Sequence, residues 1–235
     1  MALSGKSAGS KRAQHWRRRK EARPAEIVAA ALEVFAERGF AACKLDHVAA
    51  KAGISKGTLY LYFRSKEEMF EAVVKSAVLP NIAEAERMVA GFAGPTRDLL
   101  QRVLGLIVER MVGTPLSAIP KLVLAEAGNF PALARFYREA AVDRVFALLR
   151  LVLARGVARG EFRAFASPEI ERCIIGPILM TALWRHSFGR FDPDPMNLAS
   201  FLPTHLDLLL NGLNAAGIDR VDDAQVDSRA GAGRA

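Results

Sequence analysis

The spacing of apolar residues along this sequence is that of α-helices almost throughout, and no stretch sustains the alternation typical of a half-buried strand. One helix face near the N-terminus is formed by residues that recur with this spacing, namely Ile27, Ala31, Val34 and Phe35. Pro24 fits the first turn of this helix, and Gly39 fits its C-terminal end. We therefore expect an all-α protein.

Further helices are predicted wherever Pro and Gly bound an apolar-periodic segment. They fall at about 66–78, 81–91, 96–112, 117–127, 131–158, 168–188 and 197–214. Pro80 is expected to break the chain between the first two segments, or to join them through a bend. Residues 219–235 are small and polar, so we expect a disordered tail there.

The positive charge of the chain is concentrated in its first third. Residues 1–75 carry 15 Lys and Arg against 8 Asp and Glu, whereas residues 76–235 carry 18 against 17. Basic residues cluster near the N-terminus at Lys11, Arg12, Arg17, Arg18, Arg19, Lys20 and Arg23. The cluster is either a solvated tail or an arm that follows a phosphate backbone, and an arm can be disordered until it meets DNA. We expect residues 1–21 to form a disordered basic arm.

Several function classes are disfavoured by what the sequence lacks. Cys43 and Cys173 offer neither a disulfide framework nor zinc-site spacing, so we expect reduced thiols and no metal. The N-terminus has no apolar signal region, and the longest nearly unbroken apolar run, 173–184, is short for a membrane span. No Walker loop, G-x-G-x-x-G, H-E-x-x-H or G-x-S-x-G motif occurs. We therefore expect a cytoplasmic protein that is not an enzyme and needs no cofactor.

Residues 45–63, LDHVAAKAGISKGTLYLYF, carry the most specific pattern in the chain. Their apolar positions let two short helices share a small core, at Val48, Ala52, Ile54, Leu59 and Tyr62. Gly53 stands between the helices, where a sharp turn needs positive φ. Ser55 is placed to cap the second helix. A helix, a glycine turn and a capped helix are the parts of a helix-turn-helix.

The exposed face of the second helix is predicted to carry Lys56, Gly57, Thr58 and Tyr60. Short side chains near the start of a recognition helix let its backbone approach the floor of the major groove. Thr58 can hydrogen-bond a base edge or touch a thymine methyl, and Lys56 can contact guanine or phosphate. Tyr60 and Tyr62 can offer hydroxyls to phosphates. Lys66 stands at the start of the next helix, where free N–H groups and a positive charge favour an anion.

Two stretches, RPAEIVAAALEVFAERGF and LDHVAAKAGISKGTLYLYFRSKEEMF, resemble the DNA-binding domain of TetR-type (AcrR-like) bacterial transcriptional regulators. The resemblance covers about residues 22–73. It combines the helix before the motif, the glycine turn, the KGTLYxYF helix and the SKEEMF start of the linking helix. It implies an all-helical homodimer that binds a palindromic operator in double-stranded DNA. The expected domains are 22–70 for DNA binding and 71–218 for effector binding and dimerisation.

The resemblance also implies roles for individual residues. By position, Lys56, Gly57 and Thr58 would face bases, while Tyr60, Tyr62 and Lys66 would contact phosphates. The full set expected at DNA is Lys44, Ser55, Lys56, Gly57, Thr58, Tyr60, Tyr62 and Lys66, with Arg17, Arg18 and Arg19 from the arm.

The chain departs from the family pattern just before the first helix of the motif. Ser or Thr is usual in the family where Cys43 and Lys44 stand. Cys43 is a poor helix cap, but Lys44 can replace the phosphate contact by charge. A thiol at a helix start can also have a lowered pKa, which leaves a redox role for Cys43 open.

The larger domain is expected to hold both an effector and the dimer contact. Effector pockets in helical domains lie between helices and are mostly apolar, so we expect an apolar or amphipathic effector. The candidate lining residues are Met111, Phe136, Tyr137, Met180 and Trp184, each of which can equally be ordinary core. The resemblance implies that the two last long helices, about 168–188 and 197–214, form a four-helix bundle with those of a second subunit.

These observations predict a ligand-responsive transcriptional regulator, a repressor released from its operator by a small molecule. Two alternatives stay open: a DNA-binding regulator that has no effector, and a soluble small-molecule-binding protein or enzyme whose basic end is incidental. A protein that contacts several phosphates loses DNA affinity steeply with salt, which distinguishes the last alternative from the others.

Overall fold

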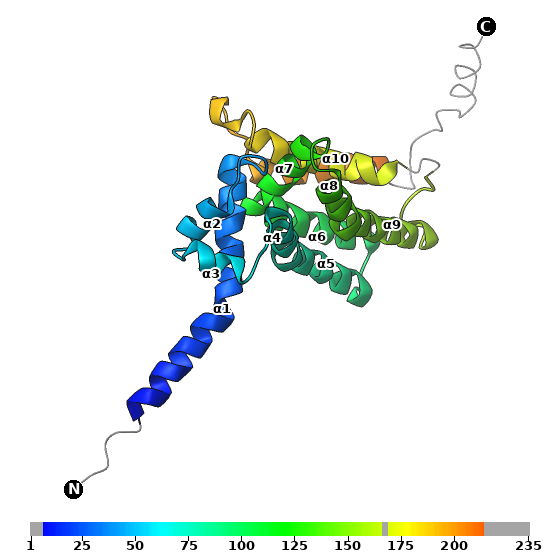
Figure 1. Ribbon diagram of the computed structural model, residues 1–235. Coiled ribbons are helices and arrows are strands. Elements are labelled where there is room, and N and C mark those ends of the chain that lie inside the picture. The colour runs from blue at the N-terminus through cyan, green and yellow to red at the C-terminus, as the bar shows by residue number, and fades with distance from the viewer. Residues whose placement is uncertain (1–6, 166–168, 214–235) are drawn as a thin grey trace.

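The computed structural model describes residues 7–165 and 169–213, with side chains from Arg23 onward. All regular structure in these ranges is helical, which confirms the all-α prediction (Figure 1). The tail predicted at 219–235 lies outside the described residues, as do residues 1–6 of the expected arm. Within the same ranges, no single helix is long and apolar enough to cross a membrane. One pair, Thr96–Val112 with Pro115–Glu126, passes that test only when joined, and it is bent by 85°.

The chain begins with four helices, α1 (Ser7–Arg38), α2 (Leu45–Lys51), α3 (Lys56–Tyr60) and α4 (Lys66–Val73). The larger part contains α5 (Leu79–Gly91), α6 (Thr96–Ile107), α7 (Ala118–Glu126), α8 (Pro131–Tyr137), α9 (Asp143–Ala158), α10 (Ile170–Arg185) and α11 (Leu198–Leu213). Within the described residues, three single π-helical turns interrupt these helices, η1 (Val74–Val78), η2 (Val108–Val112) and η4 (Arg138–Val142). Short 3₁₀ turns stand at η3 (Pro115–Ser117) and η5 (Gly189–Phe191).

Helix α1 differs from the sequence prediction at its start. Its backbone is helical from Ser7, whereas we expected a disordered arm up to residue 21 and a helix start at Pro24. Pro24 lies inside the helix, where it lacks an N–H, but the preceding stretch is rich in Ala, Arg and Lys, which favour helix. Figure 1 shows this part of α1 extending away from the rest of the molecule. Gly39 ends the helix with φ of +75°, as predicted.

Pro80 does not separate the two helices that the sequence predicted on either side of it. The chain passes from α4 through the π-helical turn η1 into α5, and Pro80 occupies the first turn of α5. The position suits proline because the missing N–H falls where the hydrogen-bond pattern changes from one helix to the next. The sequence predicted a break or a bend here, whereas the helical backbone continues through a π-helical turn.

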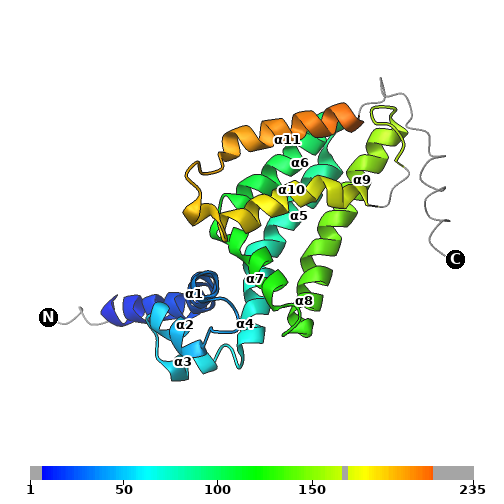
Figure 2. The same ribbon diagram turned by 90° about the horizontal axis from the view of Figure 1, so that it is seen from above.

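Two hydrophobic clusters hold the described part of the chain together. The first joins α1–α4 to Ile119, Leu122, Val123 and Leu133, which belong to α7 and α8. The second lies among α5, α6, α9, α10 and α11. Figure 2 shows α1–α3 at one end of the molecule and α11 along the edge of the larger part. The head formed by α1–α4 therefore shares its core with two helices of the larger domain.

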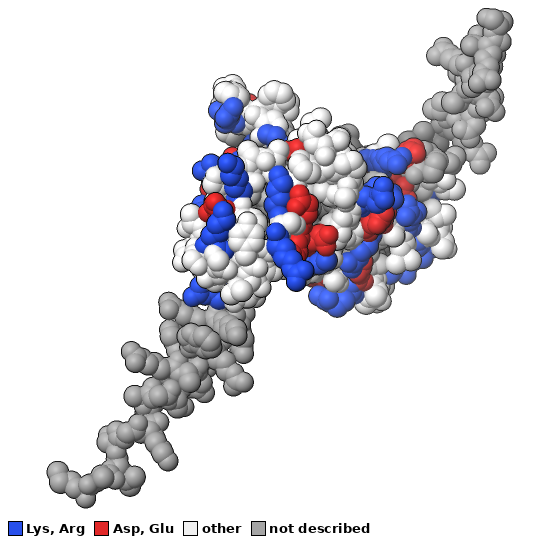
Figure 3. Space-filling model, in the orientation of Figure 1, with Lys and Arg blue, Asp and Glu red and all other residues white. Residues whose placement is uncertain are grey.

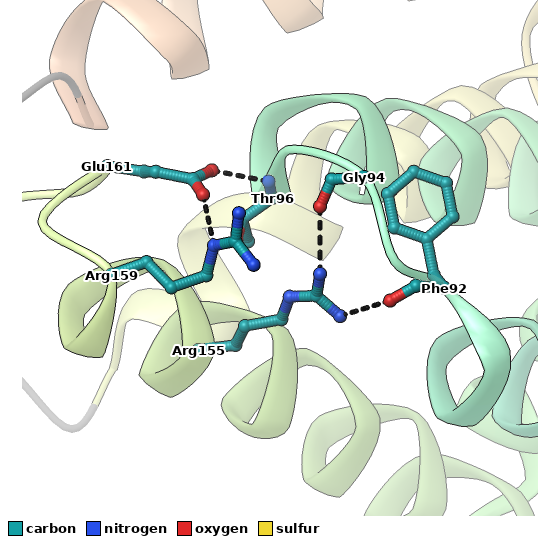
Figure 4. Close-up of polar contacts among 6 residues, drawn as sticks. All are labelled: Phe92, Gly94, Thr96, Arg155, Arg159 and Glu161. Atoms are coloured by element: carbon teal, nitrogen blue, oxygen red, sulfur yellow. Dashed lines mark hydrogen bonds and ion pairs between the residues drawn. The ribbon is translucent and has the colours of Figure 1, made fainter.

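A cluster of polar contacts fixes the turn between α5 and α6 to the end of α9 (Figure 4). The guanidinium of Arg155 donates to the carbonyl oxygens of Phe92, at 2.6 Å, and of Gly94, at 2.8 Å. The carboxylate of Glu161 accepts from the backbone N–H of Thr96, in the first turn of α6. These contacts satisfy polar groups at helix ends that would otherwise lack partners. They hold together the ends of three helices that also contribute to the cavity described below.

Candidate nucleic-acid interface and ligand cavity

The turn between α2 and α3 has the geometry that the sequence predicted for a helix-turn-helix. Gly53 has φ of +64°, a conformation that favours glycine. The hydroxyl of Ser55 accepts a hydrogen bond from the backbone N–H of Thr58 at 3.1 Å, which confirms Ser55 as the cap of α3. Leu59 is fully buried and anchors α3 against the head. The opposite side of α3 is thereby presented to solvent.

The side chains predicted to meet bases gather on this outer side of α3. Ser55, Lys56 and Gly57 are exposed, and Thr58 is half-buried. The ammonium of Lys56 pairs with the carboxylate of Asp46 on α2 at 2.9 Å, and this pair raises the pKa of Lys56. The Thr58 hydroxyl lies 2.8 Å from the Ser55 hydroxyl. DNA bound here would exchange these exposed local contacts for contacts to bases and phosphates.

Residues 60–62 complete the outer surface of the motif. Tyr60 is exposed and Tyr62 is half-buried against the head core. Leu61 between them is 81% exposed, and we did not select it from the sequence. An apolar residue flanked by two tyrosines was the available signal, but only the structure shows that it points outward rather than into the core.

Cys43 and Lys44, the two residues that differ from the usual family pattern, lie just before α2 and have different surroundings. Lys44 is the exposed N-terminal cap residue, and its backbone N–H donates to Nδ1 of His47 at 3.3 Å. Cys43 is buried in the head core. Burial raises the pKa of its thiol, while the positive charges of Lys66 and Arg38 oppose that rise. The lowered pKa that would support a redox role is therefore not found.

Lys66 is turned toward the protein rather than toward solvent. Its ammonium donates to the carbonyl oxygens of Phe40, at 3.1 Å, and of Ala41, at 3.3 Å. It also lies over the rings of Phe40, 4.6 Å from the centroid, and of Phe130, 4.8 Å from the centroid. Phe130 stands between α7 and α8, so this contact links the head to the larger domain. The structure thus places Lys66 at the junction between the head and the larger domain, and the phosphate contact expected from the sequence stays a prediction.

A second contact at this junction is made by the backbone of the turn after α1. The N–H of Ala41 donates to the carboxylate of Glu126 at 3.1 Å, and Glu126 ends α7. The ring of Phe130 packs edge-on against Phe40 with centroids 4.9 Å apart. The α7–α8 turn therefore contacts the segment that leads into α2.

A cavity of about 420 Å³ lies in the larger domain among α5, α6, α7, α8, α9 and α10. Its volume falls within the range of small-molecule sites, about 300–1,000 Å³. Each of the π-helical turns η1, η2 and η4 contributes lining residues, among them Val78, Arg110 and Arg138. The rest of the wall is almost entirely apolar, apart from Asn81 and Tyr137. The cavity is therefore suited to a largely apolar molecule.

Two family profiles match this chain. The profile described as "Bacterial regulatory proteins, tetR family" matches residues 27–73, and "Tetracyclin repressor-like, C-terminal domain" matches residues 93–197. An HTH-type transcriptional regulator of Mycobacterium tuberculosis (strain ATCC 25618 / H37Rv) is 34% identical over 167 residues, covering 68% of this chain and 76% of that protein.

The chain belongs to the TetR family of bacterial transcriptional regulators.

Solved structures agree with this assignment at the level of fold. The fatty acid degradation regulator FadR from Bacillus halodurans superposes with a TM-score of 0.68 and 21% identity, covering 80% of this chain and 98% of that one. FadR from Bacillus subtilis, in complex with stearoyl-CoA, gives a TM-score of 0.67 and 22% identity with the same coverage. TetR-family regulators bind DNA and are not enzymes, so α2 and α3 form the DNA-binding helix-turn-helix.

The cavity of this TetR-family chain includes some of the residues predicted to line it and not others. Met111 and Tyr137 are in its wall. Phe136 instead packs against the head core, 5.4 Å below the ammonium of Lys75. Met180 and Trp184 are 58% and 38% exposed on the outer face of α10. Sequence spacing could not separate these cases because an inward face and an outward apolar face have the same period.

The outer face of α10 is a strip of residues separated by three or four positions, namely Cys173, Pro177, Met180 and Trp184. The inner face carries Ile174, Ile178 and Ala182, which are fully buried in the second core cluster. On α11, Leu208 is also exposed. The outer strip is continuous along the helix, and an exposed apolar strip of this kind is typical of a protein contact.

The side chains of Arg17, Arg18 and Arg19 lie outside the described part of the structure, although the backbone there belongs to α1. Figure 3 shows basic and acidic side chains interspersed over the larger domain, in keeping with its near-neutral charge. Among the described residues, no group of three or more His, Cys, Asp or Glu is placed to hold a metal ion.

Proposed function

We propose that this TetR-family regulator is a homodimeric repressor that leaves a palindromic operator when a small molecule fills its cavity. The observation that carries the proposal is the shared position of α7 and α8. These helices contribute Val123 and Ala134 to the cavity wall, and they belong to the same hydrophobic cluster as the DNA-binding head. A ligand that changes this wall therefore acts on helices in direct contact with the head.

The DNA contacts follow from the exposed side of α3. Lys56, Gly57 and Thr58 would enter the major groove, where Thr58 contacts a base edge or a thymine methyl. Lys44, Ser55, Tyr60 and Tyr62, together with Arg17, Arg18 and Arg19 of α1, would contact phosphates. Lys66 is assigned to the head–domain junction because its ammonium is already bound by Phe40 and Ala41.

A dimer is required for reading two half-sites of a palindrome. We assign the contact to α10 and α11, whose exposed residues include Met180, Trp184 and Leu208. Burial of this apolar strip against a second copy would remove it from water, which is the main favourable contribution to obligate association. A regulator of this type acts on the bacterial chromosome and hence in the cytoplasm.

Release by an effector requires different affinities in the two states. A ligand shifts the protein toward a non-binding state only as far as it binds that state more tightly. The α7–α8 turn offers such a difference, because its residues Glu126 and Phe130 contact the turn between α1 and α2. The FadR structure from Bacillus subtilis, solved with stearoyl-CoA, supports a ligand-binding role for a domain of this fold.

The proposal is tested by selecting genomic fragments with the purified full-length protein at two salt concentrations. A shared palindrome whose affinity falls steeply with salt supports a dimer that reads sequence. Enrichment without a common motif would reject sequence-specific repression. An operator complex that no cell extract fraction weakens would favour the alternative of an effector-independent regulator.

A further inference from the structure

The cavity wall restricts the chemistry of its ligand. Apart from four residues, the lining consists of aliphatic, aromatic and proline side chains contributed by helices α5–α10. Water is poorly held in an apolar space of this kind because few groups can hydrogen-bond it. Most of the ligand surface must therefore be apolar, and its polar groups must lie where the four polar side chains, Asn81, Arg110, Tyr137 and Arg138, stand.

Tyr137 offers the first polar point. Its side chain is half-buried and lines the cavity, and desolvation raises the pKa of Tyr137 to about 12. The phenol is therefore a neutral hydrogen-bond donor at all physiological pH values. No described residue forms a hydrogen bond with its hydroxyl, which remains accessible and free to donate. An oxygen of the ligand would supply the acceptor that the protein does not.

Arg110 offers the second polar point, on the π-helical turn η2. Its guanidinium lies 3.9 Å from the carboxylates of Glu84 and Glu109, which is beyond hydrogen-bonding distance. By contrast, Arg138 donates to Asp143 at 3.1 Å. Of the two arginines in the cavity wall, Arg110 is therefore the one whose guanidinium donates no hydrogen bond to a described carboxylate.

The carboxylates of Glu84 and Glu109 can both move away from Arg110 when a ligand binds. Glu84 is partly exposed and Glu109 is exposed, so each can turn to water when a better-placed anion approaches Arg110. A carboxylate or phosphate of a ligand can accept two parallel hydrogen bonds from a guanidinium, a geometry that neither glutamate has here. A charge-assisted bidentate contact of this kind is stronger than the two distant ion pairs it replaces.

We propose that the cavity binds an anionic amphiphile, with an apolar body in the cavity, an oxygen that accepts from the Tyr137 hydroxyl, and a negatively charged group on Arg110. This inference rests on the cavity being the effector site of the proposed function. It does not depend on the operator sequence. Carboxylic acids with a long acyl chain, and their thioesters with phosphate-bearing carriers, share this chemistry.

The test measures binding of matched probes to the full-length protein by isothermal titration calorimetry. The probes are hexadecanoate, methyl hexadecanoate, which retains the carbonyl but not the charge, and hexadecanoyl-coenzyme A, in which the charge is on phosphates. The free acid or the thioester is expected to bind at least tenfold more tightly than the methyl ester. Which of the two binds more tightly identifies the source of the charge.

Two variants assign the contacts. Arg110→Met should remove the preference for the charged probe while leaving ester binding unchanged, and the matched control Arg87→Met changes an exposed arginine of α5 outside the cavity. Tyr137→Phe should weaken acid and ester alike by about fivefold, in line with the loss of one hydrogen bond. Equal binding of acid, thioester and ester by the wild type, or an Arg110→Met variant that keeps the preference, would overturn the proposal.

The outcome for the ligand is separable from the outcome for the proposed repressor. Binding with the expected dependence on Arg110, but without any loss of operator affinity, would support the ligand class and reject effector release. Failure of all three probes to bind, with sequence-specific DNA binding intact, would reject the ligand class and leave the DNA-binding function standing.

Discussion

The ammonium of Lys66 at the start of α4 lies 4.8 Å from the ring centroid of Phe130, in the turn between α7 and α8. The same ammonium donates to the carbonyl of Phe40 at 3.1 Å. One side chain thus contacts the DNA-binding head and the domain that contains the cavity. A displacement of the α7–α8 turn would change both contacts together.

Replacement of this side chain tests its structural position. Lys66→Met should lower the free energy of unfolding by about 1–2 kcal/mol, because it removes two hydrogen bonds to backbone carbonyls and a partly desolvated cation–π contact. Urea unfolding measures the loss. Lys75→Met is the matched control, because Lys75 is more exposed over Phe136, and a change below about 0.5 kcal/mol is expected there. If stability is unchanged and the salt slope of DNA binding falls by about one, Lys66 contacts a DNA phosphate instead.

The recognition helix is tested by Thr58→Ala. The variant should lose about 1–3 kcal/mol of affinity for the preferred operator, the typical worth of a good base contact, and much less for random DNA. The helix cap should persist, because the Ser55 hydroxyl still accepts from the backbone N–H of Thr58 when its contact with the Thr58 hydroxyl is lost. Fluorescence anisotropy on both DNAs measures the effect. A loss of equal size on the two DNAs would show that Thr58 contacts only the backbone.

Leu61 provides a prediction that the sequence alone did not offer. It is 81% exposed, so Leu61→Ala should change the free energy of unfolding by less than about 0.5 kcal/mol. On operator DNA, the loss of apolar contact with sugars or thymine methyls should cost about 1 kcal/mol. Leu151→Ala on α9 is the control, since that leucine is also exposed but lies far along the chain from the motif. Unaltered DNA affinity would exclude Leu61 from the interface.

The dimer contact is tested on the outer face of α10. Met180→Asp introduces a charge in the middle of the exposed apolar strip, and the dissociation constant of the dimer should rise at least about tenfold. Analytical ultracentrifugation across a dilution series measures it. Leu151→Asp places the same charge on an exposed leucine of α9 and should leave the dimer intact. If the two variants behave alike, α10 is not the contact.

The imidazole of His186 predicts a pH dependence of stability. Burial lowers the pKa of His186, and the charges of Arg185 and Lys121 lower it further. Between that lowered pKa and the ordinary value of 6.5, the unfolded chain binds a proton that the folded chain does not. The free energy of unfolding should therefore rise with pH across this window and lose that dependence above it.

The variant His186→Gln tests whether His186 causes this dependence. The glutamine amide can still hydrogen-bond the Ser117 hydroxyl, which lies 2.7 Å from Nε2 of the imidazole. Urea unfolding at several pH values from about 5 to 8 should show a flatter profile in the variant, because the titrating group has been removed. Parallel profiles for the two proteins would mean that another group causes the dependence.

Local chemistry in the sequence was sufficient to predict most of the helices and the helix-turn-helix. Gly53 adopts positive φ and Ser55 caps α3, because both properties depend on a few neighbouring atoms of the backbone. Helix periodicity likewise located the segments from 96 to 158 within a few residues. The family resemblance over residues 22–73 then supplied the roles of the outward side chains of α3.

Tertiary packing determined which side of each helix faces a neighbouring helix, and therefore which side chains line the cavity and which are exposed. Met180 and Tyr137 both lie on apolar, periodic helices, yet Met180 is exposed while Tyr137 lines the cavity. The sequence shows that Lys66 stands at the start of a helix. Only the fold shows that its ammonium lies over the ring of Phe130, which belongs to a turn far away in the chain. The sequence determined the helices and the helix-turn-helix because these depend on short-range geometry. The cavity, the junction and the outer strip required the fold because they are made by residues far apart in the chain.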